Sequence, residues 1–429
     1  MNDRNKGLTA LLVSAAAAGV YIEATRDRSP APTPAPSASV SVSASVSAKP
    51  APPRAATPAE IERTIATLSR ALKTPAGDPQ NPWGLAHGLV AFGKDFETTD
   101  GQKAVDVIAS YAELTDGHYG FPAKKGDQLV EPHRALQVKT LLEVGVPLDR
   151  ELRTSDGKTV TLARLLADLR ASATLPETDA QWHQAAWLLG ALVLADEQQG
   201  DAGASVLAPD QQGDAGASVL APDQQGDAGA SFTARLARAA LDRLEKDQRV
   251  CVEYAGDAEH AFAPGSPLRK AKTEKTGIYG HSCGGLHLVQ AVLRAHTYLD
   301  THRVQAQLGV LLFRYEAERA ALKDLLQKHP EQGLILRIQE LKFFGHLVET
   351  FALARRLGLV NADTEGGKRI LTTLGQAAGD VVTVVAELDQ GGVFQRLDAI
   401  RRQRKQSALD LVGDGCHALR GLRWMTNEK

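Results

Sequence analysis

Apolar residues recur with helical spacing along most of this 429-residue chain, and the helices that they predict are of two alternating kinds. In one kind, such as the segment from Thr57 to Leu72, the apolar side chains form a single stripe, which is typical of a helix with one face in water. In the other, such as Trp83 to Gly93, nearly every residue is apolar or small, so the helix must be surrounded by protein. The alternation, repeated roughly six times, predicts an all-α fold of buried inner helices enclosed by amphipathic outer helices.

Two architectures satisfy this alternation. In an (α/α)6 toroid, the inner helices line a central axis and touch protein on every side, while the outer helices face water. An open helical solenoid alternates in the same way and is the alternative. The predicted amphipathic helices lie at residues 57–72, 102–114, 161–169, 232–246, 303–328 and 368–388, and the buried ones at 83–93, 132–143, 182–195, 286–295, 335–357 and 407–425. The only strand that we expect is the short run Arg249–Tyr254.

Three parts of the chain are expected to lie outside this helical core. Residues 1–24 combine basic residues at the start with a short, alanine-rich apolar run, which resembles a secretory signal peptide or, alternatively, an uncleaved membrane anchor. Residues 25–57 are rich in Pro, Ala and Ser and predict an extended, disordered linker. Folding should begin with the capping box Thr57-Pro58-Ala59-Glu60, which leaves residues 58–429 as one domain.

A tandem repeat interrupts that domain at residues 198–231. Its thirteen-residue unit, Gln-Gln-Gly-Asp-Ala-Gly-Ala-Ser-Val-Leu-Ala-Pro-Asp, occurs twice in full and once in part. The unit matches no solenoid period. We therefore interpret it as a duplication within a tolerant surface loop.

Composition limits the possible partners. The formal net charge is −2 and aromatic residues make up 5% of the chain, so neither an overall positive field nor a base-stacking surface favours nucleic acid. Contact with a membrane is expected only through the N-terminal segment. The expected location is outside the cytoplasm: periplasmic, membrane-anchored or extracellular.

The buried helix at 286–295 has a glycine-rich entry that carries two reactive side chains, Cys283 and His287. Their spacing of four places them on one side of a helix, where the pair can share a metal ion or simply pack. The other cysteines are Cys251 and Cys416. In an exported protein one disulfide and one free thiol are possible, with three pairings.

Each predicted buried helix carries a histidine, mostly close to its start. These are His87, His133, His183, His287, His346 and His417, each followed two residues later by an apolar residue. If the inner helices are parallel, the six imidazoles line one mouth of a central cavity, where they are suited to proton transfer or metal binding. The candidate catalytic residues are His87, His183, His287 and His346. The alternative is that each histidine is a hydrogen-bonded core residue.

A metal site needs three or four converging ligands. The best local set is His281, Cys283 and His287, joined by Cys416 or His417 from the last helix. Cysteine and histidine ligands suit zinc, so zinc is the cofactor that this set favours.

The alternating helices and the histidine frame resemble the (α/α)6-toroid enzymes, a superfamily of glycoside hydrolases, polysaccharide lyases, sugar epimerases and lanthionine cyclases. In lanthionine cyclases, zinc is held by a Cys on one inner helix and an adjacent Cys-His pair on another. The positions similar to that pattern are Cys283, Cys416 and His417. The surrounding sequence differs from that family, because Ser282 precedes Cys283 and Ala418 follows His417.

The sequence thus predicts an exported enzyme whose His-lined cavity acts on a saccharide or peptide substrate. The alternative is a non-catalytic helical protein that presents a surface or pocket to a partner in the cell envelope. A shared fold does not decide between them.

Overall fold

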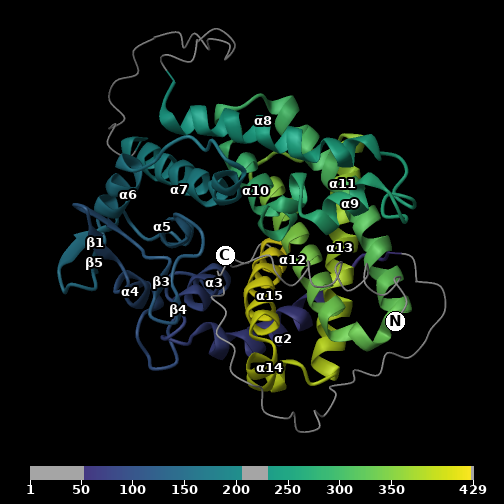
Figure 1. Cartoon of the computed structure of the whole chain (residues 1–429), viewed down its shortest axis with the longest axis horizontal. Helices are drawn as coiled ribbons and strands as arrows, with labels where there is room; N and C mark the ends of the chain where they lie inside the picture. Colours follow the sequence, from purple (N-terminus) through teal and green to yellow (C-terminus); the bar gives the residue numbers. More distant parts are fainter. Residues whose placement is uncertain (1–52, 205–229, 427–429) are drawn as a thin grey trace, which may run out of the picture.

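The computed structural model describes residues 53–204 and 230–426, and only the backbone of residues 201–204. The described chain is mostly helical, which confirms the expected fold class (Figure 1). The helices are α2 (Pro58–Ala76), α3 (Pro82–Phe92), α4 (Ala104–Ala109), α5 (Leu136–Glu143), α6 (Leu162–Ala171), α7 (Asp179–Ala204), α8 (Phe232–Glu253), α9 (Pro267–Glu274), α10 (Leu286–Arg294), α11 (Thr301–Lys328), α12 (Gly333–Arg356), α13 (Glu365–Gln390), α14 (Leu397–Gln403) and α15 (Lys405–Thr426).

Several predicted features lie outside the described residues. These are the signal peptide or anchor at 1–24, nearly all of the linker at 25–57, and most of the tandem repeat. The repeat does not begin in a loop, however, because its first residues continue α7 as far as Ala204. Gln198, the first residue of the repeat, donates a hydrogen bond from its amide to the carbonyl oxygen of Leu142. No helix in the described part of the chain is long and apolar enough to cross a membrane.

Helix starts follow the capping signals in the sequence. The Thr57 hydroxyl accepts a hydrogen bond from the Glu60 backbone, and the Glu60 carboxylate accepts one from the Thr57 backbone, so the predicted capping box is present. Thr161 caps α6 in a similar way, by accepting from the backbone N–H of Arg164. Such caps satisfy backbone donors that have no partner within the helix.

Three small hairpins between α4 and α6 were not expected. They pair β1 (Glu113–Thr115) with β2 (His118–Gly120), β3 (Lys124–Lys125) with β4 (Gln128–Leu129), and β5 (Glu151–Arg153) with β6 (Thr159–Thr161), all antiparallel. Strands of two or three residues are too short to show the alternation that identifies a strand in sequence. The one strand that we expected, Arg249–Tyr254, is wrong, since this run is the end of α8. In this run Cys251 is buried while Val252 is 54% exposed, so its burial follows the amphipathic helix, and tertiary context overrides strand propensity.

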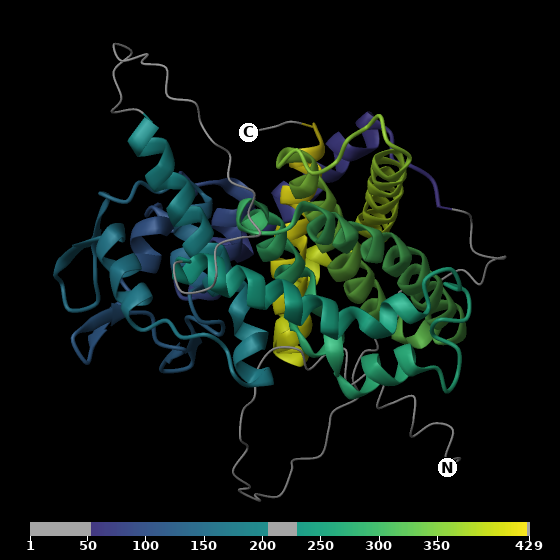
Figure 2. The ribbon, with the colours of Figure 1, turned by 90° about the horizontal axis from the view of Figure 1, so that it is seen from above.

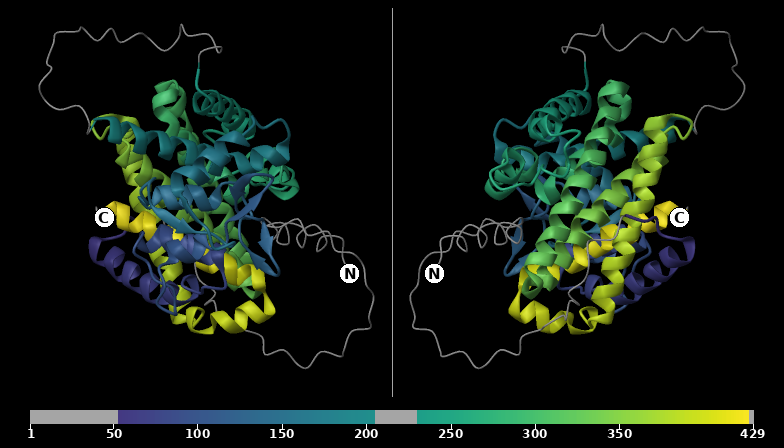
Figure 3. Two further views of the ribbon diagram at one scale, coloured as in Figure 1. Left: turned by 90° about the vertical axis from the view of Figure 1, so that its left-hand side faces the viewer. Right: turned by 90° about the vertical axis from the view of Figure 1, so that its right-hand side faces the viewer.

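Six helices pack in sequence around the centre of the molecule. α3 packs against α5, α5 against α7, α7 against α10, α10 against α12, α12 against α15, and α15 against α3. Seen from above, α15 runs through the middle, between the hairpin-bearing part and the part with α11 and α13 (Figure 2). The N-terminal helix α2 packs beside α15, so the first and last described helices meet (Figure 3).

Candidate active site

A cavity lies among these six helices and has about 820 Å³ of space, counting the part open to solvent. Its lining includes the apolar or aromatic residues Trp83, Leu136 and Trp187. It also includes charged groups, among them Lys342 of α12 and Asp410 of α15. A concave space with a few convergent polar groups is a candidate small-molecule site.

Five of the six histidines of the predicted frame line this cavity. They are His87, His133, His287, His346 and His417. Four of their rings form one cluster: the His346 and His417 centroids are 4.2 Å apart, His287 lies 4.7 Å from His346 and 5.1 Å from His417, and His87 lies 5.3 Å from His417. His133 stands apart from the cluster and stacks on Trp187, with the ring centroids 3.8 Å apart.

Two residues that we predicted for the site are absent from the cavity lining and form a separate pair. His183 of α7 contacts His281 ring to ring, with 5.0 Å between centroids. His281 is buried, and its Nε2 lies 2.7 Å from a carboxylate oxygen of Asp247 on α8. His281 is therefore anchored to a carboxylate instead of joining the proposed metal ligands.

The three cysteines are free. Cys416 is fully buried away from the cavity lining, and burial raises the pKa of its thiol. The structure thus separates it from Cys283 and His417, with which the sequence grouped it. The next residue, His417, does line the cavity, because adjacent residues on a helix point in different directions.

Cys283 reaches the cavity from a turn and not from a helix. It lies in the 3₁₀ segment η4 (Ser282–Gly285), and α10 begins only at Leu286. Three residues in succession are left-handed: Cys283 with φ 51°, Gly284 with φ 59° and Gly285 with φ 78°. A left-handed cysteine is a strained conformation that persists only where surrounding contacts enforce it.

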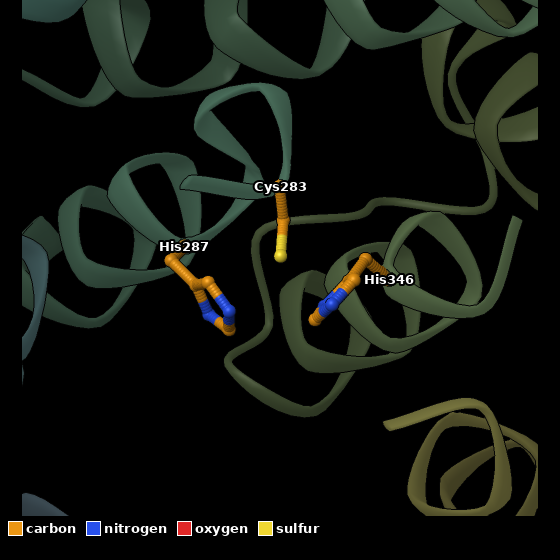
Figure 4. A group of neighbouring side chains, drawn as sticks. All are labelled: Cys283, His287 and His346. Atoms are coloured by element: carbon orange, nitrogen blue, oxygen red, sulfur yellow. The ribbon is translucent and has the colours of Figure 1, made fainter. Parts of the chain in front are cut away.

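This turn directs Cys283 toward two of the histidines. Figure 4 shows the side chains of Cys283, His287 and His346 pointing to one spot, from the turn, from α10 and from α12. The ligand atoms of the three residues all lie within 4.8 Å of one another. A second such group, His346, Glu349 and His417, adjoins it. In that group the Glu349 carboxylate is already engaged by Arg420 and His417, so the first group has the freer ligand atoms.

His346 is held in the orientation that a metal ligand needs. Its Nε2 lies 3.2 Å from Oδ1 of Asp414, while its buried Nδ1 makes no hydrogen bond to the described residues and lies 3.5 Å from the Glu349 carboxylate. Metal-binding histidines commonly donate their second ring nitrogen to a carboxylate, which fixes the tautomer and leaves the first nitrogen for the ion. Nδ1 is therefore the ring nitrogen that this geometry leaves for an ion.

Burial sets the charge of most histidines in the cluster. It lowers the pKa of His417 to about 4 and that of His87 to about 3, and it lowers the pKa of His287 well below its usual range. These three rings are neutral at pH 7 and can bind a metal or accept a proton. Burial also acts to lower the pKa of His346, but its neighbours Cys283, Asp414 and Glu349 outweigh burial and raise this pKa well above its usual value.

Three charged residues of the site, Lys342, Glu349 and Asp410, were not singled out from the sequence. Lys342 Nζ lies 3.7 Å from Asp410 and 3.9 Å from Asp414, and burial raises the pKa of Asp410 to about 6. One signal for them exists in the sequence: Lys342 and Glu349 stand within the stretch 335–357 that was predicted to be buried on all sides. A charged residue in such a helix must be paired or functional.

Glu131 lies two residues before the cavity residue His133, and the pKa of its carboxyl tests whether this part of the chain is buried. Its carboxyl accepts a hydrogen bond from the backbone N–H of Gln137, and burial raises its pKa to about 8. Between pH 5 and pH 8 the unfolded chain loses this proton while the folded chain keeps it, so the wild-type protein loses stability as pH rises. We expect Glu131→Gln to be increasingly more stable than wild type across this window. Thermal melts of both proteins at pH 5, 6.5 and 8 check this, and a constant difference would contradict it.

Comparison with known proteins adds no relative: no family model, curated protein or solved structure matches the chain.

Proposed function

We propose that this protein is an exported enzyme that binds one divalent metal ion, zinc in the first place, through Cys283, His287 and His346. The observation that carries the proposal is the convergence of these three ligand atoms within 4.8 Å of one another at the wall of a large cavity. Donor atoms around a tetrahedral zinc lie about 3.3–3.6 Å apart. Small side-chain rotations therefore suffice to close the site.

The donor set favours zinc over hard cations. One thiolate and two imidazoles are borderline-soft ligands, which suit zinc and not magnesium or calcium. Three protein ligands leave a fourth position open, as in catalytic and not structural zinc sites. An ion held in this way supplies Lewis-acid catalysis to a substrate in the cavity.

The remaining cavity residues have roles that fit this chemistry. His417 lies beside the proposed ligand His287, and His87 lies beside His417. Both rings are neutral at pH 7, so they can form hydrogen bonds with a substrate in the cavity. Trp83 is half-buried in the lining and offers an aromatic surface to a substrate. Saccharides and peptides remain the two substrate classes that we propose.

We further infer that the helices form an (α/α)6 toroid. The sequence of packing partners from α3 through α5, α7, α10 and α12 to α15, and from α15 back to α3, supports a closed ring. Five of these helices, or the turns that lead into them, contribute a histidine to the cavity lining. An open solenoid would not bring the first and last members of the series together.

The test is the metal content of the purified protein. We expect the full chain to retain close to one zinc per molecule after exhaustive dialysis and to rebind it after chelation. Cys283→Ser should lose this zinc because a hydroxyl does not replace a thiolate ligand. Cys416→Ser is the matched control: it changes a buried cysteine outside the cavity and should keep its zinc. A wild-type protein without zinc, or equal zinc in both variants, would contradict the proposal.

A second candidate function rests on the same cysteine. The Cys283 sulfur and a ring nitrogen of His346 lie within 4.8 Å of each other, so His346 can take up the thiol proton and make Cys283 a nucleophile. In that case Cys283 should react with iodoacetamide much faster than Cys251 or Cys416, and added zinc should not slow the reaction. Protection by zinc would favour the metal site instead.

A further inference from the structure

The turn that carries Cys283 is fixed by one buried side chain, that of Arg314 on α11. Its Nη1 donates a 2.9 Å hydrogen bond to the backbone oxygen of Gly284, the residue after Cys283. Arg314 is 1% exposed, and a guanidinium is rarely so deeply buried unless its donors are satisfied. This bond therefore ties the left-handed turn to a long helix of the outer layer.

Arg314 is itself held from several sides. Its Nε and Nη2 donate to the Glu318 carboxylate over 3.0 and 2.8 Å, and Glu318 also accepts from Lys272 and from the Tyr279 hydroxyl. Lys272 and Tyr279 belong to α9 and to η3 (Gly277–Gly280), the segments that precede the turn. Because the Arg314 guanidinium forms hydrogen bonds at both ends, it can adopt few orientations. The position of α11 therefore determines the position of the turn.

The same guanidinium also contacts the helix that carries His346. It lies over the Phe343 ring of α12 at 5.8 Å and over the Tyr279 ring at 5.4 Å. Phe343 is one helical turn before His346. Arg314 thus contacts both the turn that presents Cys283 and the helix that presents His346.

Other side chains lie close to the glycines of the turn. A Cβ at Gly284 would lie 3.0 Å from Nη2 of Arg314, and one at Gly285 would lie 2.2 Å from Cδ1 of Ile278. On the entry side, the buried His281–Asp247 pair anchors the residue two before Cys283. The strained φ of Cys283 is therefore imposed by contacts on both sides of it.

We propose that Arg314 is a positioning residue that holds the Cys283 sulfur in the geometry the site requires, and thereby sets its metal affinity. The proposal rests on the proposed function for its metal readout. Arg314 itself touches neither the ion nor the substrate. Residues that orient a metal ligand from outside the coordination shell typically change affinity by about 10–100-fold when they are replaced.

The experiment compares Arg314→Met and Arg314→Lys with Arg319→Lys. Arg319 is also on α11 and is mostly buried, and it pairs with Asp380 of α13. We expect zinc affinity, measured by competition with a chromophoric chelator, to fall about 10–100-fold in Arg314→Met. The zinc affinity of Arg314→Lys should lie between those of Arg314→Met and wild type, because lysine keeps the positive charge but cannot form hydrogen bonds at two ends as a guanidinium does. The zinc affinity of Arg319→Lys should match that of wild type. In the cobalt-loaded protein, the thiolate-to-cobalt charge-transfer band should weaken only in the Arg314 variants.

A second readout keeps this proposal separate from the metal site. The rate at which iodoacetamide alkylates Cys283, followed by peptide mass spectrometry with Cys251 and Cys416 as internal references, should rise severalfold in both Arg314 variants because the turn is released. If wild type binds no zinc, the proposed function fails, and this rate alone decides the role of Arg314. Zinc affinity and alkylation rate that are unchanged in Arg314→Lys and Arg314→Met, or altered equally in Arg319→Lys, would overturn the positioning role.

Discussion

His287→Ala is expected to abolish zinc binding, with a loss of affinity greater than about 100-fold, which is the upper range for residues that only support a ligand. His287 is one of the three converging side chains, and two ligands do not hold a zinc ion against a chelator. Its ring lies at the cavity wall, between Trp187 and His346. Isothermal titration with zinc at pH 7.5 measures the loss.

His183→Ala is the matched control for that variant. His183 belongs to the same sequence pattern, but its ring contacts His281 and is absent from the cavity lining. Its zinc affinity should equal that of wild type. If both alanine variants bind zinc as wild type does but melt at lower temperature, the histidines are structural, because loss of a buried polar group typically costs about 1–3 kcal/mol.

The sequence predicted the helical scaffold well because the scaffold depends on local signals. The amphipathic stripe and capping box of α2 and the nearly all-apolar pattern of α3 each follow from residues a few positions apart, which is the range over which helical periodicity acts. The histidine frame placed five of six imidazoles in one cavity for the same reason. His183 does not line that cavity, although α7 is a helix as expected.

The site itself was only partly predictable, because it depends on contacts between residues far apart in the chain. A helical reading put Cys283 one turn before His287, yet the successive glycines form a left-handed turn instead. His281 pairs with Asp247, and Arg314 bonds to the turn from thirty residues away in sequence. No periodicity links such residues, and only the packing of α8, α10 and α11 brings them together.

A network of buried charges below the histidine cluster is expected to be the most sensitive point for stability. Arg420 of α15 bonds to Glu143 of α5 and to Glu349 of α12, and it is 5% exposed. Burial raises the pKa of both carboxyls, but Arg420 and the other partners outweigh burial and hold both pKa values below the usual range. One guanidinium thus joins three of the helices around the cavity.

Arg420→Met should lower the free energy of unfolding by about 3–5 kcal/mol, because it keeps the volume but leaves a buried carboxylate without its cation. Glu143 retains Lys139 and Arg294. Glu349 retains His417, Gln290 and His346, whose Nδ1 lies 3.5 Å from it, but no guanidinium or ammonium group. Urea unfolding at pH 7 measures the loss. Arg401→Met is the control: Arg401 is partly exposed and lies 3.8 Å from Asp398, so its removal should change stability by less than about 0.5 kcal/mol.

The pH dependence of the stability difference between wild type and Arg420→Met shows whether the difference is electrostatic. A carboxyl whose pKa is lowered by folding stabilises the protein above its unfolded pKa, and this contribution is lost as pH falls through the folded pKa. In Arg420→Met the Glu349 carboxyl can take up a proton more easily, so the deficit should be full at pH 7 and shrink below about pH 4.5, near the unfolded pKa of glutamate. A deficit that stays constant from pH 7 to pH 4 would mean that Arg420 stabilises the protein by packing on Trp424, whose ring lies 4.7 Å from the guanidinium, and not by neutralising Glu349.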